Sequence, residues 1–380
     1  MKSSTTNSQQ FDLHWRGTLS DYVTAIAWSP QGKIAVSSAA GEVMLWRDLP
    51  NTQENNWPLL PLQMAEGQSL DCLAFSQDGQ KLAAGGQAGQ VKIWCLHDDT
   101  RTYRCKPLHT IENAPTWVDK LAWNPSSNQL AFSLGRYVQV WDADKGGVIA
   151  TLNFDNSSVL ALDWSPDGQY LAIAGYQGAK IWNAQDWNDD PCVLVVPSAS
   201  LAIAWSPDGK YLACGNMDRT ITVIDWNNSI ASKGASTNQN YFPWVMRGFP
   251  GKIRQLAWSQ AQTQLDAPLL AASSVEGIVV WEKQANDSLG WASRLLQQHS
   301  GVVQELAFQP NSLLLASASE DGWVCLWQKA KKLAQILQGA PNGFSCLAWH
   351  PQGQQLAAGG QSGELLIWSK GMRGQGFSNR

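Results

Sequence analysis

The sequence is poor in charge and carries no segment suited to a membrane. Asp, Glu, Lys and Arg make up 15% of its 380 residues, against about 25% in an average soluble domain. The formal net charge is −4, and no block of cations offers the clustered positive surface that nucleic-acid binders need. No apolar run approaches the ~18 residues that cross a bilayer, and the polar N-terminus lacks the apolar core of a secretory signal. We therefore expect a cytoplasmic protein with no membrane partner, and nucleic acid is not expected as a partner.

Motifs for catalysis and metal binding are also missing. The seven cysteines include no CxxC pair, whereas zinc sites need paired Cys or His at short spacing. Neither HExxH, GxSxG nor a Walker phosphate loop occurs. We predict no catalytic residue, no metal site and no cofactor, so that the protein is not an enzyme. The cysteines are interpreted as reduced thiols of an apolar core.

Tryptophan, by contrast, is abundant, with 21 residues against 7 Tyr and 9 Phe. Most of this excess belongs to one string that recurs eight times. In each unit an aromatic first anchor follows Ala or, once, Asp, and an apolar run ends in a second anchor about 18 residues later. The first anchors are Trp28, Phe75, Trp123, Trp164, Trp205, Trp258, Phe308 and Trp349, and the second anchors are Trp46, Trp94, Trp141, Trp182, Ile224, Trp281, Trp327 and Trp368.

Each unit predicts four short strands. Three runs rich in β-branched, aromatic and small apolar residues are separated by turns such as Ser29-Pro30-Gln31-Gly32. A further apolar stretch precedes each unit, at residues 13–19, 57–64, 103–111, 148–154, 192–196, 241–248, 291–297 and 332–337. Four-stranded sheets repeated every 40 to 45 residues or so are typical of a β-propeller.

The seventh unit carries a family resemblance. It contains His299-Ser300-Gly301, then Leu315-Ala316-Ser317-Ala318-Ser319-Glu320-Asp321-Gly322, and ends in Trp327. This string resembles a WD40 repeat, and the similarity runs through residues 13 to 368. The resemblance implies a structural hydrogen-bonded set made of His299, Ser317, Asp321 and Trp327. The other units depart from that set, so we expect apolar packing to hold most blades together.

The predicted fold is all-β: one WD40 β-propeller, with eight four-stranded blades closed by the N-terminal strand. Segment 13–19 is expected to complete the last blade, because joining the two chain ends in one sheet removes free strand edges. Seven blades, the commoner number in the family, is the alternative. The predicted boundaries are a disordered segment at 1–12, a single propeller domain at 13–368 and a flexible tail at 369–380. The mutual similarity of the repeats and the abundance of Gln favour a bacterial member of the family.

The function predicted from this resemblance is a non-catalytic scaffold for one or more partner proteins. In WD40 proteins the connections at one end of the ring line a rim where partners commonly dock. The candidate partner-binding residues on this rim are Tyr22, Asp71, Trp117, Asp119, Lys252, Arg254, Glu305 and Trp323. Long connections at 47–56, 97–104 and 227–240 could also serve function. The alternative is a propeller enzyme or small-ligand binder that uses the central channel, since such a site would draw on several blades and leave no motif.

Overall fold

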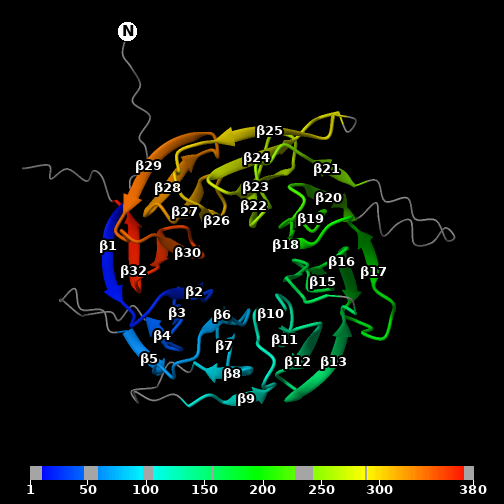
Figure 1. The fold of residues 1–380 in the computed structure, drawn as a ribbon, viewed down its shortest axis with the longest axis vertical. Helices are drawn as coiled ribbons and strands as arrows, with labels where there is room; N and C mark the ends of the chain where they lie inside the picture. Colours follow the sequence, from blue (N-terminus) through cyan, green and yellow to red (C-terminus); the bar gives the residue numbers. More distant parts are fainter. Residues whose placement is uncertain are drawn as a thin grey trace, which may run out of the picture.

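Short antiparallel strands, grouped into eight four-stranded sheets, follow one another around a ring (Figure 1). The computed structural model describes residues 11–46, 59–96, 106–155, 157–226, 243–286 and 289–371. The long connections predicted at 47–56, 97–104 and 227–240 lie outside these residues, as do 1–10 and 372–380. The described chain therefore forms the eight-bladed propeller that the repeats predict, and the seven-bladed alternative is wrong.

In each blade the innermost strand comes first in the chain and the outermost strand last, except in the blade that closes the ring. Blade 1 holds β2 (Val23–Trp28), β3 (Ile34–Ser38), β4 (Val43–Trp46) and β5 (Leu59–Gln63), and blade 2 holds β6 (Leu70–Phe75), β7 (Lys81–Gly86), β8 (Gln90–Cys95) and β9 (His109–Glu112). Blade 3 holds β10 (Leu121–Trp123), β11 (Gln129–Leu134), β12 (Tyr137–Asp142) and β13 (Gly147–Asn153), and blade 4 holds β14 (Ala161–Trp164), β15 (Tyr170–Gly175), β16 (Gly178–Asn183) and β17 (Cys192–Val195).

The second half of the chain repeats the same order. Blade 5 holds β18 (Ser200–Trp205), β19 (Tyr211–Asn216), β20 (Ile221–Asp225) and β21 (Trp244–Met246), and blade 6 holds β22 (Gln255–Gln262), β23 (Pro268–Ser274), β24 (Gly277–Lys283) and β25 (Trp291–Leu296). Blade 7 holds β26 (Val303–Phe308), β27 (Leu315–Ser319), β28 (Trp323–Gln328) and β29 (Lys332–Gln338), and blade 8 holds β30 (Phe344–Trp349), β31 (Gln355–Gly360), β32 (Glu364–Lys370) and β1 (Phe11–Thr18).

The N-terminal strand closes the ring. β1 pairs antiparallel with β32 along its whole length, from Phe11 opposite Lys370 to Thr18 opposite Glu364. The predicted domain boundaries at 13 and 368 therefore fall inside strands, because two further residue pairs extend the sheet at this end. Gln335 of β29 fixes the start of β1 as well, since its amide accepts from Phe11 N (2.9 Å) and donates to Phe11 O (2.7 Å).

The core lies between blades rather than at one centre. Eight clusters of buried apolar side chains occur among the described residues, and each is shared by two adjacent blades. The second anchors are all buried within them, for example Trp46 and Trp94 at 1% and 0% exposure. A single blade leaves both faces of its sheet uncovered, so a blade needs its two neighbours to bury its apolar residues.

The first anchors link neighbouring blades by hydrogen bonds that the sequence did not reveal. In five blades the first anchor is a Trp whose indole N–H donates to a backbone carbonyl of the preceding blade. That carbonyl belongs to the residue directly before the first anchor of the preceding blade. The distances are 3.0 to 3.1 Å, and the donors are Trp28, Trp123, Trp164, Trp258 and Trp349. Tryptophan at this position thus combines apolar burial with a polar tie between blades.

The connections from the first to the second strand of the blades are tight turns. Gly32, Gly168 and Gly209 have φ values of 81°, 72° and 69°, a left-handed conformation that glycine adopts without steric cost. In the turns of blades 4 and 5 a serine hydroxyl donates to the aspartate two residues later, as Ser165 does to Asp167 (2.5 Å) and Ser206 to Asp208 (2.6 Å). The recurring Ser-Pro-Asp-Gly string thus has a local physical basis.

Candidate functional site at the rim face

The innermost strands all begin at the same end of the ring, which we call the rim face. The first residues of adjacent innermost strands lie side by side, as shown by the bonds from Ser345 Oγ to Val23 O (2.6 Å) and from Cys72 Sγ to Val118 O (3.3 Å). The connections from outer to inner strands and from second to third strands lie on this face. All eight candidate residues, Tyr22, Asp71, Trp117, Asp119, Lys252, Arg254, Glu305 and Trp323, occur in or beside these connections.

Trp117 is distinguished from the other tryptophans by its exposure. Eight tryptophans are not anchors, and seven of these belong to the described residues. Trp15, Trp187, Trp226, Trp244, Trp291 and Trp323 pack against the clusters between blades, whereas Trp117 is 53% exposed. Its neighbour Val118 is fully buried and anchors this stretch of chain. The structure therefore leaves Trp117 as the tryptophan of the described residues that is open to a partner.

Bulges at the rim end of the innermost strands redirect side chains. The pairing register shifts near the first residues of β2, β6, β18, β26 and β30, and such bulges re-aim side chains and end regular pairing. Asp71 is the extra residue of β6, and Glu305 directly follows the extra residue of β26. Both carboxylates are partly buried and lie on strands that surround the ring axis (Figure 1).

Charged groups from several blades influence one another around the ring axis. Burial raises the pKa of Glu305 to about 7, although the Leu306 N–H and the positive charge of Lys120 lower it. Lys120 belongs to blade 3 and Glu305 to blade 7, which stand on opposite sides of the axis (Figure 1). Burial and the nearby Asp119 likewise raise the pKa of Asp71. Lys120 was not among the predicted residues, because its position opposite Glu305 depends on ring closure.

The remaining candidates fall into three environments. Tyr22 contacts Ser345 of blade 8 through its hydroxyl, and burial raises the pKa of that hydroxyl. Lys252 and Arg254 are exposed at the start of blade 6. Trp323 begins the third strand of blade 7, away from the axis, and its ring packs on the cluster between blades 6 and 7. The eight residues thus share one face but do not converge on one point.

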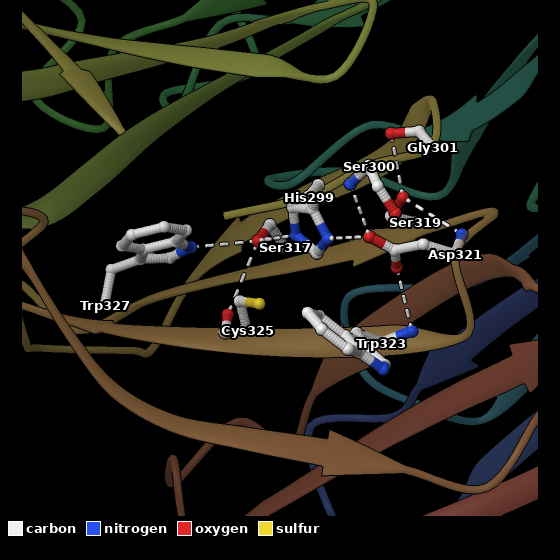
Figure 2. A network of polar contacts seen from close by, with 9 residues as sticks. All are labelled: His299, Ser300, Gly301, Ser317, Ser319, Asp321, Trp323, Cys325 and Trp327. Atoms are coloured by element: carbon white, nitrogen blue, oxygen red, sulfur yellow. Dashed lines mark hydrogen bonds and ion pairs between the residues drawn. The ribbon is translucent and has the colours of Figure 1, made fainter. Parts of the chain in front are cut away.

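The structure joins His299, Ser317, Asp321 and Trp327 into one chain of hydrogen bonds (Figure 2). His299 Nδ1 lies 2.9 Å from Asp321 Oδ2 and Nε2 lies 2.8 Å from Ser317 Oγ, which also accepts from Trp327 Nε1 at 2.9 Å. Asp321 accepts in addition from the backbone N–H groups of Ser300 and Trp323, both at 3.0 Å. Because burial lowers the pKa of His299 more than Asp321 raises it, the ring is neutral at neutral pH. The set ties β27, β28 and the turn between them to the connection before β26.

Other blades use different polar sets or none. The positions equivalent to Ser317 hold Val36, Ala84, Phe132, Ile173, Cys214, Ala272 and Ala358, so no hydroxyl is available there. Blade 5 instead buries Asn216, which accepts from Ser200 Oγ at 2.8 Å and donates to Thr220 and Thr222 at 3.0 and 3.1 Å. This network was not predicted from the sequence, because its members match no family position and meet only when the strands pair.

Asp163 is a half-buried carboxylate where the other seven units have alanine. Its Oδ2 accepts from the backbone N–H of Trp205 in the next blade at 2.8 Å, while the indole N–H of Trp205 has no partner within the described residues. Burial raises the pKa of Asp163 from 3.8 to about 7, against the opposing effect of the Trp205 and Trp164 N–H groups. This carboxylate replaces the indole-to-carbonyl tie found between other blades.

We expect Asp163→Asn to stabilise the fold at alkaline pH. The pKa of this carboxyl is raised in the folded state, so the unfolded chain releases its proton first as the pH rises from about 4 to 7. The free energy of unfolding therefore falls over this range. Each pKa unit corresponds to about 1.4 kcal/mol, so the wild type should lose on the order of 2 to 4 kcal/mol that the amide variant keeps. Thermal unfolding at pH 4.5 and pH 8 measures this, and the gain should appear only at pH 8.

Asp189→Asn, which alters an exposed carboxylate, is the control and should leave the pH profile of the wild type unchanged. An equal effect of Asp163→Asn at both pH values would contradict the raised pKa.

Buried thiols and the remaining polar groups point to no further centre. Cys72, Cys214, Cys325 and Cys346 are buried without disulfides, and burial raises the pKa of the last three to about 12. Within the six described stretches, no group of three or more His, Cys, Asp or Glu side chains is placed to hold a metal ion. In the same part of the chain, no helix is long and apolar enough to cross a membrane.

Comparison with known families agrees with this geometry. The family model described as WD domain, G-beta repeat matches residues 9–47, 291–328 and 331–369. Each match covers an outer strand and the three strands that follow it: β1 to β4, β25 to β28 and β29 to β32. A model described as eukaryotic translation initiation factor eIF2A matches residues 65–223. The fold defines a closed eight-bladed β-propeller. The chain carries WD40 repeats and is a WD40-repeat propeller protein.

Curated relatives match over parts of their length. Human apoptotic protease-activating factor 1 is 34% identical over 93 residues, covering 23% of this chain and 7% of the relative. WD repeat-containing protein 18 from Danio rerio is 24% identical over 139 residues, covering 35% and 31%. The transcriptional corepressor LEUNIG_HOMOLOG from Arabidopsis thaliana is 22% identical over 301 residues, covering 78% and 30%. The matches therefore span less than a third of the length of these relatives.

Proposed function

We propose that this chain is a non-catalytic scaffold that presents the rim face of its propeller to partner proteins. The observation that carries the proposal is the exposure of Trp117, Lys252 and Arg254 on a face built from rigid strands and short turns. Aromatic and Arg side chains dominate the energetics of protein interfaces, and an exposed Trp gains affinity at low entropic cost because it has few rotatable bonds. WD40 propellers are generally interaction scaffolds, and the relatives above belong to that class.

The test is binding by a paired variant. Trp117→Ala combined with Arg254→Ala is expected to weaken partner binding at least tenfold while lowering the melting temperature by no more than a few degrees, since both side chains are exposed and surface substitutions cost little stability. Affinity purification from cells of the source organism, followed by titration of the recovered partner, measures the effect. The matched control pairs Leu265→Ala with Lys145→Ala, which alter exposed residues near the opposite end of the ring.

A second candidate function is a small-ligand binder at the ring axis. The placement of Lys120 and Glu305 on blades that face each other across the axis favours it (Figure 1), and the positive charge of Lys120 lowers the pKa of Glu305. A ligand on the axis would meet polar groups from opposite blades. The same purification separates the two functions. Recovery of no partner, together with turnover or binding of a small molecule that Glu305→Gln abolishes, would replace the scaffold proposal.

A further inference from the structure

Three consecutive blades expose a large apolar side chain at the same turn position. The residue directly after the second strand is Tyr176 in blade 4, Met217 in blade 5 and Val275 in blade 6, with exposures of 53%, 52% and 36%. The equivalent residues of the other five blades are Ala39, Gln87, Gly135, Glu320 and Gln361. Tyr176, Met217 and Val275 therefore form an arc on the rim face, over the blades that run from β14 to β25 (Figure 1).

Val275 occupies a backbone conformation that is unusual for its residue type. Its φ is 55°, a left-handed conformation that is strained for a β-branched residue and costs roughly 1 to 3 kcal/mol. Its side chain remains 36% exposed, so burial offsets only part of that cost. Glycine would occupy this position without strain. An exposed valine kept in a strained turn is better explained by contact with another molecule.

Cations lie beside the part of this apolar arc that blades 5 and 6 contribute. Arg219 lies in the turn of Met217, and the segment before β22 exposes Arg247, Lys252 and Arg254. Within the described residues, none of these four cations forms an ion pair with an acidic side chain. The acidic groups beside them are Asp218, which accepts from the Thr220 hydroxyl at 2.7 Å, and Glu276.

The segment that displays these cations is fixed in place. Phe249 and Ile253 are buried at 6% and 0% exposure between the displayed residues. Ser274 ties the segment to the end of β23, since its hydroxyl accepts from Gly251 N at 3.0 Å and donates to Gly251 O at 2.7 Å. The cations are therefore presented by an ordered backbone, which reduces the entropy that binding must remove.

On blades 7, 8, 1 and 2 the charge of the rim face has the opposite sign. The connections of blades 7, 8, 1 and 2 expose or half-expose acidic side chains with few cations among them. Those acidic residues are Asp21, Glu66, Asp71, Glu112, Glu320 and Glu364, and the cations are Arg16 and Lys92, the latter paired with Glu66 at 2.8 Å. The positive sector thus overlaps the apolar arc on blades 5 and 6 and covers only part of the face.

We propose that the arc of Tyr176, Met217 and Val275, with Arg219, Arg247, Lys252 and Arg254 beside it, docks an acidic segment of a partner protein that carries large apolar side chains. The proposal rests on the scaffold function and specifies its partner. Apolar side chains of the segment would cover the arc, and its carboxylates would pair with the unpaired cations. A nucleic acid fits less well, because Met217 and Val275 present aliphatic side chains, whereas bases bind by stacking on aromatic rings.

The proposal is tested with defined peptides and fluorescence anisotropy. The probe is a labelled twelve-residue peptide that alternates Glu with Leu, and its controls replace Glu by Lys or Leu by Ser. We expect the Glu-Leu peptide to bind the wild-type chain at least tenfold more tightly than either control peptide. Rising salt should weaken the binding, because the ion pairs are at the surface. Equal binding of the Lys peptide, or tighter binding of a uridine oligonucleotide, would overturn the proposal.

Variants locate the binding on the arc. Lys252→Glu with Arg254→Glu should weaken binding of the Glu-Leu peptide at least tenfold. Tyr176→Ser with Met217→Ser should weaken it at least fivefold. Two control pairs should stay within twofold of the wild type: Lys329→Glu with Lys332→Glu, and Leu13→Ser with Leu295→Ser, whose leucines are 52% and 55% exposed. Val275→Gly should also weaken binding without lowering the melting temperature, because it removes a strained residue. Wild-type-like binding by both arc pairs would overturn the proposal.

Two further results separate this proposal from competing explanations. If the wild type sediments as a dimer that the arc pairs make monomeric, the arc binds the acidic sector of a second copy and not a partner protein. If a partner purified from native cells binds the arc pairs as tightly as the wild type, the docking surface is elsewhere while the scaffold function stands. If no partner is recovered at all, the scaffold function itself fails.

Discussion

Deleting residues 1–18 is expected to abolish the monomeric, cooperatively unfolding protein. The deletion removes β1, which pairs with β32 from Phe11 to Thr18, and it removes the ring of Phe11, 1% exposed and 5.4 Å from that of Trp349. Loss of a buried Phe side chain alone costs about 3 to 5 kcal/mol, a large share of the roughly 5 to 15 kcal/mol that stabilises a typical domain. The freed edge of β32 would then be open to pairing with other chains.

Size-exclusion chromatography and thermal unfolding measure this result. The truncated chain should elute as aggregates, and addition of a synthetic peptide of residues 9–19 should restore a monomeric peak. A peptide with Phe11 and Trp15 replaced by Ser should fail to do so. Leu13→Ser in the full chain should have little effect, since Leu13 is 52% exposed. A truncated chain that stays monomeric with an unchanged melting temperature would show that ring closure contributes nothing.

Trp327→Ala is expected to destabilise the protein by about 3 to 5 kcal/mol, the usual loss for a large buried aromatic. Trp327 is 3% exposed in the cluster between blades 6 and 7, and its indole N–H donates to Ser317 at 2.9 Å. The substitution leaves a cavity and also removes one donor from the chain of bonds in Figure 2. The free energy of unfolding measured by urea denaturation reports the sum of both effects.

Substitution by phenylalanine separates the hydrogen bond from the packing. Trp327→Phe retains most of the apolar contact but loses the donor to Ser317. Trp94→Phe is the matched control, because Trp94 is equally buried and its indole N–H has no partner within the described residues. We expect Trp327→Phe to cost more than Trp94→Phe by about 0.5 to 1.5 kcal/mol. Equal costs would mean that the polar set of blade 7 adds no stability.

Much of the fold was predictable because it depends on local patterns repeated eight times. The first anchors, the turns and the apolar stretch before each unit indicated four strands per unit, and the structure confirms all eight sheets. The pairing of the N-terminal segment with the last unit was also predictable. Each repeat begins with the outer strand of the preceding blade. The first repeat has no preceding blade along the chain, so its outer strand must complete the last blade. Within the described residues the pairing reaches Phe11 and Lys370, past the predicted bounds, because residues without a repeat signature pair there.

The candidate site was predictable only in part. Family resemblance placed the eight rim residues on one face, and it placed His299, Ser317, Asp321 and Trp327 in one blade. It did not distinguish the packed Trp323 from the exposed Trp117. That difference depends on whether a neighbouring blade covers the ring, and burial by a distant segment leaves no local pattern.

The excess of tryptophan and the shortage of charge reflect the same architecture. Sequence alone predicted the repeated unit, the strand order and the closure of the ring, because strand propensity and turn chemistry act over a few residues and recur. The structure decided between eight blades and seven. Tertiary structure decided which groups meet between blades. Asp163 reaches the backbone of Trp205, Lys120 acts on Glu305 from the opposite blade, and Tyr176, Met217 and Val275 come into line. These relations join residues 40 or more positions apart, so they exist only once the ring has closed.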